Sequence, residues 1–267
     1  MKNFVRKILS AACVALSVMV ITGCTTVPYS GRTRTMLAVS PAEEQRIGRD
    51  AWAQIKAKEK ISTNRKYNEA LQRVGKNLAS VIKEPGFDWE FVVFDSATPN
   101  AFCLPGGKVA VYSALFKYTA NDAELASVVG HEIAHAVARH GAERLTHSMG
   151  LQIIGKAIEL GTENNQQIMA AYGVASNVGA MLPYSRTHEY EADYLGLIFL
   201  AQAGYSPQAA LKFWDKFGKL SQINALQEFF STHPAGDNRI ERLREKLPQA
   251  EEYYKDAQVK RGLGQRY

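Results

Sequence analysis

Cysteine is scarce in this sequence: three occur in 267 residues, Cys13, Cys24 and Cys103. Two of them fall within the first 24 residues, so the rest of the chain contains one cysteine. A single thiol cannot close an internal disulfide, and the fold therefore does not depend on a disulfide framework. We predict that Cys103 is a packed thiol rather than a nucleophile.

Dense positive charge is also lacking. The formal charge is +6, but Lys2, Arg6 and Lys7 lie in an N-terminal segment without acids, and the rest of the chain carries 29 bases against 26 acids, or +3. No stripe of lysine and arginine and no RNA-binding aromatic motif is present, which argues against nucleic acid as a partner. With 46% apolar and 22% charged residues, the composition is that of an ordinary globular protein.

The N-terminus lacks a hydrophobic run long enough for a convincing membrane span. The apolar stretch from Ile8 to Ile21 follows a basic segment, which is the layout of a secretory signal peptide. It ends in Ile21-Thr22-Gly23-Cys24, which resembles the bacterial lipobox, where the cysteine is acylated and becomes the first residue. We expect residues 1–23 to be a lipoprotein signal peptide and Cys24 to carry lipid. The alternative is an ordinary signal peptide with an incidental cysteine.

Lipidation of Cys24 would decide where the protein is located. Several acyl chains hold a protein to a bilayer for a long time. The next residue is Thr25 rather than an aspartate that would suggest inner-membrane retention, so we expect the periplasmic face of the outer membrane. The stretch from Thr25 to Val39 contains proline, glycine and several threonines and predicts a flexible tether. We therefore divide the mature chain into a lipidated tether over 24–40 and one domain over 41–267.

Helical patterns dominate this domain. Ser40 is placed as the N-cap of a helix from Pro41 to about Lys58, and a second helix is predicted over about 64–82. From Asn121 onward the pattern is helical almost to the end. The stretch 145–182 is rich in alanine and glycine, and it predicts either a tightly packed helical hairpin or a mobile cover over a cleft.

Two short β-rich segments lie between these helical regions. They are Trp89–Phe94 and Lys108–Tyr112. The turn signal Pro105-Gly106-Gly107 should fold residues 100–104 back beside the second of them. The predicted fold class is therefore α+β, predominantly helical, with a small antiparallel sheet.

A metal-binding pattern lies in the helix predicted from Asn121 to His140. His131 and His135 are four residues apart, so their imidazoles lie one turn apart and can share one ion. Glu132 projects about 100° away from His131, beside the metal, where a carboxylate can take a proton from an attacking water. The alternative is a partly exposed histidine pair on an ordinary helix.

A later acidic helix completes a possible site. A metzincin would place Gly and His where this chain has Ala138 and Gly141, so that class is excluded. Glu189 and Asp193 are four residues apart on one helical face: Glu189 can bind zinc while Asp193 accepts the distal N–H of a liganding histidine. Glu191 points elsewhere. A solvated helix surface is the alternative for these acids.

Together these motifs resemble a known family. His131-Glu132-Ile133-Ala134-His135, Glu189-Tyr190-Glu191-Ala192-Asp193, and Thr232-His233-Pro234 with Arg239 are similar to those of the HtpX/BepA-type gluzincin peptidases, a family that includes the CAAX prenyl endopeptidases. The similarity runs from about residue 40 to 245. It implies a zincin-like domain with an HExxH active-site helix and one Zn²⁺ per chain, bound by His131, His135 and Glu189, with Glu132 as general base.

The resemblance implies roles for further residues. His233 should lie near the metal, where it either stabilises the oxyanion or caps zinc in a latent state. Arg239 either supports the transition state or is structural. Asn100-Ala101-Phe102 and Pro105-Gly106-Gly107 resemble the segment that precedes the catalytic helix. If Asn100, Ala101 and Phe102 form a sheet edge, they could pair with an extended substrate backbone.

The resulting functional prediction is a zinc endopeptidase that degrades unfolded or misassembled proteins of the bacterial envelope. The chain lacks the transmembrane helices of HtpX and the helical-repeat domain of BepA, and its layout is closest to the small outer-membrane lipoprotein members of the family. Its expected partners are polypeptide substrates and, through the lipid, a membrane. Two alternatives are a chaperone-like or scaffold lipoprotein with a closed zinc site and a zinc hydrolase acting on peptidoglycan peptides.

Other residues that often carry chemistry receive structural interpretations. His140, His147 and His188 are predicted to be surface or capping histidines. Tyr184 and Tyr190 flank the helix of Glu189 and are predicted to pack in the core or at the rim of the cleft.

Overall fold

The computed structural model describes residues 24–35, 39–84, 86–155, 185–234, 238–264 and 266. The predicted signal peptide and most of the stretch 145–182, with Tyr184, lie outside these residues. No helix in the described ranges is long and apolar enough to cross a membrane.

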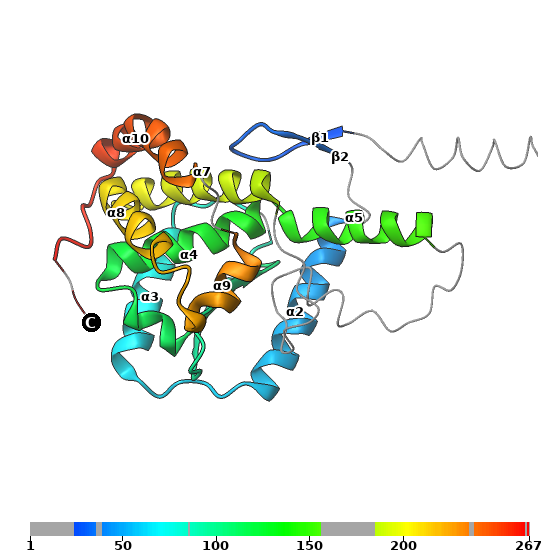
Figure 1. Ribbon diagram of the computed structural model, residues 1–267, viewed down its shortest axis with the longest axis horizontal. Coiled ribbons are helices and arrows are strands. Elements are labelled where there is room, and N and C mark those ends of the chain that lie inside the picture. Colours follow the sequence, from blue (N-terminus) through cyan, green and yellow to red (C-terminus); the bar gives the residue numbers. More distant parts are fainter. Residues whose placement is uncertain are drawn as a thin grey trace, which may run out of the picture.

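The described chain alternates a few short strands with longer helices (Figure 1). The strands are β1 (Cys24–Thr26), β2 (Thr33–Thr35), β3 (Glu90–Phe94), β4 (Ala101–Leu104) and β5 (Lys108–Tyr112). The α-helices are α2 (Pro41–Lys58), α3 (Arg65–Ala79), α4 (Asp122–Val137), α5 (His140–Gly155), α7 (Arg186–Gln202), α8 (Pro207–Gly218), α9 (Gln227–Thr232) and α10 (Arg239–Asp256). Two 3-10 helices, η1 (Ser113–Lys117) and η2 (Asn224–Leu226), complete the set.

Side-chain caps fix where several helices begin. The hydroxyl of Ser40 accepts the backbone N–H of Glu43 at the start of α2, as the sequence predicted. Asn64 caps α3 and Asn121 caps α4 in the same way. The predominantly helical α+β class is confirmed.

The main sheet is mixed rather than antiparallel. Its strand order is β3-β5-β4, with β4 antiparallel to β5 and β5 parallel to β3. The turn at Gly106 and Gly107, where φ is 81° and 84°, folds β4 back on β5 as expected. Strand β5 lies between β3 and β4 and runs antiparallel to its hairpin partner β4 and parallel to β3. The prediction of an antiparallel sheet is wrong for the β3–β5 pair.

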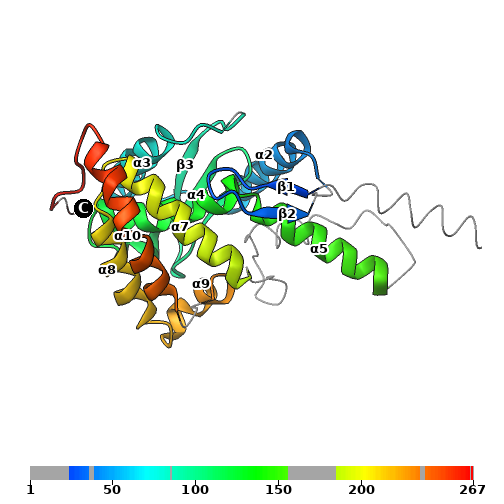
Figure 2. The same ribbon diagram turned by 90° about the horizontal axis from the view of Figure 1, so that it is seen from above.

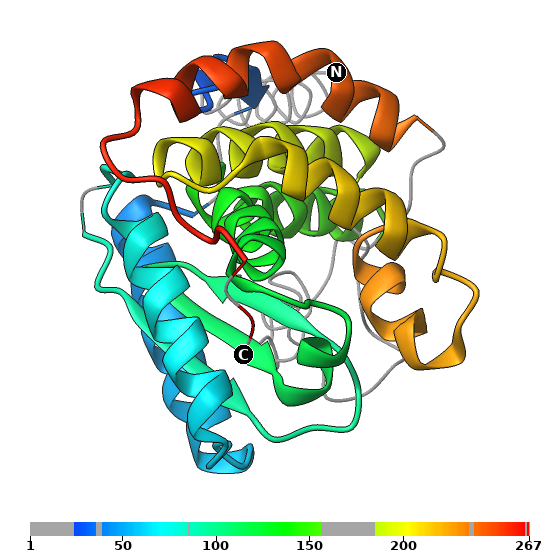
Figure 3. The ribbon, with the colours of Figure 1, turned by 90° about the vertical axis from the view of Figure 1, so that its left-hand side faces the viewer.

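Helix α4 lies at the centre of the molecule. Figure 3 shows α7, α8 and α10 on one side of it, and the sheet with α2 and α3 on the other. Every residue of α4 except Glu124 is buried. Neighbouring elements therefore cover this helix on all its faces.

Two glycines allow α7 to lie very close to α4. A Cβ added to Gly196 would lie 2.9 Å from the backbone nitrogen of His131, and one added to Gly130 would lie 3.2 Å from the carbonyl oxygen of Gly196. Side chains at these positions would force the helices apart. The contact brings the helix that carries Glu189 against the helix that carries His131 and His135.

The helix predicted from Asn121 to His140 breaks before its expected end. Arg139 has a φ of 59°, in the left-handed region that ends a helix, so α4 stops at Val137 and α5 begins at His140. The guanidinium of Arg139 holds this turn through Glu44 and the carbonyl oxygen of Val39. The break turns the His140 ring back toward His135.

Residues 24–35 form a hairpin instead of the flexible tether expected there. β1 and β2 pair antiparallel, and Figure 2 shows the hairpin beside α7 and α5. The ring of Tyr29 packs edge-on against Phe199, with 5.3 Å between the ring centroids, and Arg34 donates to the carbonyl oxygen of Ala138. These side-chain contacts, which the proline and glycine content does not reveal, hold the hairpin on the domain.

Candidate metal centre

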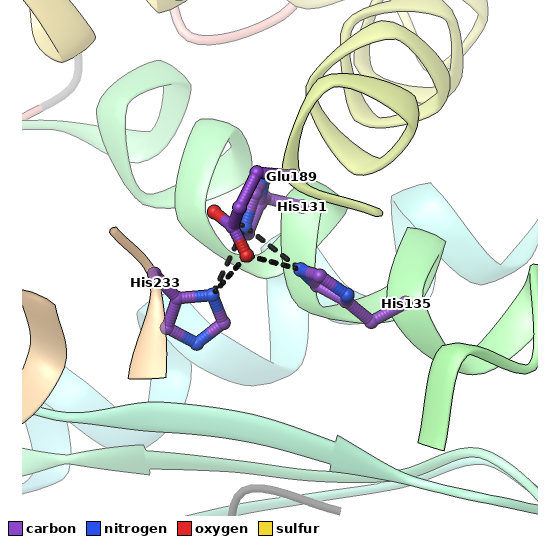
Figure 4. A group of neighbouring side chains, drawn as sticks. All are labelled: His131, His135, Glu189 and His233. Carbon is purple, nitrogen blue, oxygen red and sulfur yellow. Dashed lines mark hydrogen bonds and ion pairs between the residues drawn. The ribbon is translucent and has the colours of Figure 1, made fainter. Parts of the chain in front are cut away.

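Four donor side chains from three segments of the chain converge at the N-terminal end of α7 (Figure 4). His131 and His135 come from α4, Glu189 from α7, and His233 from the residue that follows α9. All four are at most 2% exposed. The structure thus brings together the three predicted metal ligands and His233, which was expected to lie near them.

The spacing of the donor atoms fits a tetrahedral zinc ion. Nε2 of His131 lies 3.1 Å from Nε2 of His135 and 3.3 Å from Nδ1 of His233. Oε1 of Glu189 lies 3.3 Å from Nε2 of His135 and 3.2 Å from Nδ1 of His233. Four donors at zinc-ligand distances around one ion lie about 3.3 Å from each other. The donor set and its spacing therefore suit zinc.

The partners of the two α4 histidines orient their lone pairs toward this centre. Nδ1 of His131 lies 3.0 Å from Oδ1 of Asp193, and Nδ1 of His135 lies 2.9 Å from Nδ1 of His140. A ring that donates from Nδ1 presents a lone pair at Nε2. Both Nε2 atoms then face each other and the Glu189 carboxylate, and a cation between them satisfies all three.

The ionised state of the Glu189 carboxyl also fits a metal ligand. Burial acts to raise the pKa of this carboxyl, but the surrounding rings of His233, His131 and His135 outweigh burial and hold the pKa well below its usual range. Its Oε2 atom is buried without a hydrogen-bond partner. An ionised, buried carboxylate with a spare oxygen is a suitable ligand for a divalent metal.

Glu132 lies beside this group rather than within it. Its Oε1 is 3.5 Å from Nε2 of His233 and is buried without a hydrogen-bond partner. Burial raises the pKa of this carboxyl to about 7. A carboxylate with that proton affinity can accept and release a proton near neutral pH, which is the property of a general base.

Arg239 contacts the donors from the other side. Its Nη2 donates to Oδ1 of Asp193 at 2.6 Å, and its Nη1 lies 3.8 Å from Oε2 of Glu189. The guanidinium stacks on Trp214, with 3.9 Å from Cζ to the ring centroid. These contacts hold Asp193 against His131. Of the two interpretations of Arg239, transition-state support or a structural role, the observed contacts are those of a positioning residue.

Asn100, Ala101 and Phe102 lie at the edge of the sheet next to α4. Strand β4, which begins at Ala101, pairs only with β5 among the described residues, and it packs against α4. The amide of Asn100 donates to Glu228 at 3.3 Å, and its Oδ1 accepts the backbone N–H of Ala101. The expected edge position is therefore observed.

The sequence interpretation missed the environment of His140. This residue is completely buried, not on the surface, and burial lowers its pKa to about 4. Its Nε2 bonds Oε2 of Glu191 at 2.9 Å. His188 is partly buried and bonds Glu143, whereas His147 is exposed as predicted. No sequence signal reveals this environment, because the break at Arg139 that places His140 beside His135 is seen only in the structure.

Cys103 and Tyr190 are packed side chains rather than reactive ones. Cys103 is a buried free thiol, and burial raises its pKa well above the usual value, so it is not an activated nucleophile. Tyr190 lies at the rim under Arg242, whose Cζ is 4.0 Å from the ring centroid. Both observations agree with the predictions.

Comparison with known proteins adds the family. Residues 65–247, more than half of the chain, match peptidase family M48. This chain belongs to peptidase family M48. The matched range includes both helices of the HExxH and Glu189 motifs, His233 and Arg239. The prediction of a gluzincin-type metallopeptidase is confirmed at the level of the M48 family, whose members bind zinc.

Several named proteins are similar to this M48 chain. The mitochondrial metalloendopeptidase OMA1 of Arabidopsis thaliana is 41% identical over 160 residues, covering 58% of this chain and 30% of that protein. OMA1 of Schizosaccharomyces pombe is 33% identical over 233 residues, covering 84% and 67%. The beta-barrel assembly-enhancing protease of Escherichia coli (strain K12) is 28% identical over 223 residues, covering 80% and 46%. The chain therefore spans between 30% and 67% of the length of these curated relatives.

The geometry predicts that zinc binding depends on Glu189. Glu189→Ala removes the only carboxylate donor of the group and should weaken zinc binding enough that the variant is purified with little metal, whereas wild type should carry one zinc per chain. Metal analysis by mass spectrometry measures this. Glu245→Ala, an exposed change on α10, is the matched control and should retain zinc. Full zinc content in Glu189→Ala would contradict the assignment.

Proposed function

We propose that this M48 protein is a zinc-dependent endopeptidase of the bacterial cell envelope that hydrolyses peptide bonds of unfolded or misassembled envelope proteins. The observation that carries the proposal is the group of four buried donor atoms at tetrahedral spacing with Glu132 beside it. His131, His135 and Glu189 would hold the ion, and Asp193 would orient His131. The peptidase domain would extend over 41–267.

The proposed chemistry assigns distinct tasks to the chain's residues. Zinc held by these donors supplies a Lewis acid that polarises the scissile carbonyl and makes the attacking water more acidic. Glu132 takes a proton from that water while the water oxygen bonds to the carbonyl carbon. Glu132 then delivers this proton to the leaving amine nitrogen as the C–N bond breaks. Burial, which raises the pKa of the Glu132 carboxyl, suits a group that must take up a proton.

His233 would close the metal site in the resting protein. Its Nδ1 is as close to Glu189 and His131 as the other donors are, so His233 would occupy the fourth coordination position. A zinc ion with four protein ligands has no open position for substrate, and activity then requires His233 to move away. The same arrangement favours a second candidate function, a scaffold or chaperone-like lipoprotein whose site remains closed.

Substrate would bind along β4. An edge strand offers unpaired backbone groups to an extended peptide, and such pairing gives affinity with little demand on sequence. Residues Ala101–Leu104 are buried in the structure, so this pairing would require the edge of β4 to become exposed. This mode suits unfolded polypeptides better than folded ones.

Location in the envelope rests on the N-terminal residues. Cys24 is both the lipobox cysteine and the first residue of β1, so a lipid on it would hold the domain close to the bilayer surface. Thr25 favours the outer membrane. Among the similar proteins is one named for enhancing beta-barrel assembly, and that name is compatible with an envelope role.

The assigned base predicts the effect of Glu132→Gln. The amide preserves size and zinc ligands but cannot take a proton, so the variant should bind zinc like wild type while cleavage falls about 10²–10⁴-fold. Release of peptides from casein and metal analysis on the same preparations test both parts. Cleavage at the wild-type rate would remove Glu132 from its role.

The capping role of His233 predicts a gain of activity. His233→Ala should open the fourth position and raise casein cleavage several-fold while zinc content stays near one per chain. His147→Ala, an exposed histidine outside the centre, is the control and should leave cleavage unchanged. A fall in cleavage for His233→Ala would instead assign His233 to the transition state and reject the closed resting state.

If Cys24 is lipidated, the substitution Cys24→Ser should release the protein from the membrane fraction of cells. Cells expressing wild type should incorporate labelled palmitate into the protein and retain it with outer membranes after fractionation, and the variant should lose both properties. Equal palmitate labelling of the two proteins would contradict acylation at Cys24.

A further inference from the structure

His140 connects a metal ligand to the rest of the fold through both of its ring nitrogens. Its Nδ1 lies 2.9 Å from Nδ1 of His135, and its Nε2 lies 2.9 Å from Oε2 of Glu191. The ring is completely buried. A buried imidazole with a partner on each nitrogen has a fixed orientation and a fixed tautomer.

Glu191 is in turn held by the β1–β2 hairpin. Nε of Arg32 donates to its Oε2 at 2.6 Å, and the hydroxyl of Ser30 donates to its Oε1. Both residues lie at the turn between β1 and β2. Glu191 is 7% exposed, so these contacts are little screened by solvent.

The hydrogen bonds have one consistent direction. If His135 binds the metal through Nε2, its Nδ1 carries the proton and donates to Nδ1 of His140. His140 then carries its own proton on Nε2 and donates to Glu191. Glu191 also accepts from Arg32 and Ser30, so every donor in the series meets an acceptor.

We propose that this series, which we call the hairpin relay (Ser30 and Arg32, Glu191, His140, His135), positions His135 and makes the zinc affinity of the centre depend on the N-terminal hairpin. The proposal rests on zinc binding by the proposed function. Removal of the relay carboxylate would leave His140 free to rotate or to change tautomer, and His135 would lose the acceptor that fixes its own tautomer. Residues in the relay are positioning residues, because apart from His135 they do not contact the ion.

A second metal ion is the competing interpretation of the same region. His140, Glu143 and His188 have side chains of metal-binding types within reach of each other. The Arg32 guanidinium, however, already binds both nearby carboxylates, with Nη2 2.5 Å from Glu143 and Nε 2.6 Å from Glu191. A divalent ion there would be repelled by this fixed charge, so the relay describes the group better.

The relay also explains why a hairpin so close to Cys24 is tied to the domain. Arg32 and Ser30 lie a few residues after the proposed lipid attachment point, and Arg34 from the same hairpin bonds the carbonyl oxygen of Ala138 at the break between α4 and α5. The hairpin that follows the proposed lipid attachment point therefore contacts both the relay, at Glu191, and the break between α4 and α5.

Zinc affinity of matched variants tests the relay. In the full-length protein in detergent, Glu191→Ala should raise the zinc dissociation constant about 10–100-fold, measured by competition with a chromogenic chelator. Glu191→Gln should have a smaller effect, because its amide oxygen can still accept from His140. Arg32→Gln should weaken zinc only a few-fold, since Ser30 still holds Glu191.

Glu143→Ala is the matched control. Among the described residues, Glu143 makes two hydrogen bonds to Arg32 and one to His188, so it meets the relay only at Arg32 and has no hydrogen bond to Glu191, His140 or His135. The metal-free variants Glu191→Ala and Glu143→Ala should unfold at similarly lowered temperatures, while the zinc affinity of Glu143→Ala should fall no more than that of Arg32→Gln. Equal zinc affinity in the two variants would overturn the relay. If wild type binds zinc and cleaves casein in that case, the proposed function survives and only the relay fails.

A spectroscopic measurement decides the question even if Glu191→Ala fails to fold. The nitrogen NMR spectrum of zinc-loaded wild type labelled with ¹⁵N-histidine should show His140 as a neutral ring protonated on Nε2, with no proton on Nδ1. A His140 ring protonated on Nδ1, or on both nitrogens, would reject the relay, because His135 would then have no acceptor.

Discussion

The close approach of α4 and α7 at Gly130 and Gly196 is the constraint on which the metal centre depends. His131 follows Gly130 directly, and a side chain on Gly196 would collide with its backbone. Glu189 lies two turns before Gly196 on the same helix. Only with the two backbones in contact can its carboxylate reach both histidines, so two residues without side chains set the geometry of those that carry the chemistry.

Each histidine of α4 is oriented from a different end of the chain. His131 is held by Asp193, and Asp193 accepts a hydrogen bond from Arg239 of α10, in the C-terminal part of the chain. His135 is held by His140 and, through Glu191, by the N-terminal hairpin. The Nε2 lone pairs of His131 and His135 face each other in a buried site, which is energetically costly without a cation. The hydrogen-bond partners of the two rings, Asp193 and His140, hold them in that orientation. Zinc at this candidate centre would therefore stabilise the folded chain.

Membership in family M48 accounts for part of this arrangement. The match covers residues 65–247 and so includes the four side chains of the candidate metal centre, together with Glu132, Asp193, His140 and Arg239. The hairpin with Ser30 and Arg32 precedes that range. The family thus explains the donor group, and the contacts of the hairpin are a feature of this chain that the match does not describe.

The sequence alone determined the α+β class, the ends of α2, the β4–β5 hairpin and the likeness to gluzincin peptidases, because caps, turn glycines and the HExxH spacing act over a few residues. It also indicated Glu189 and Asp193 as partners of the α4 histidines. Only the tertiary structure decided that β3 runs parallel to β5, that α4 breaks at Arg139, and that His140 and the hairpin support His135. These features depend on contacts between residues far apart in the chain, for which local periodicity carries no signal.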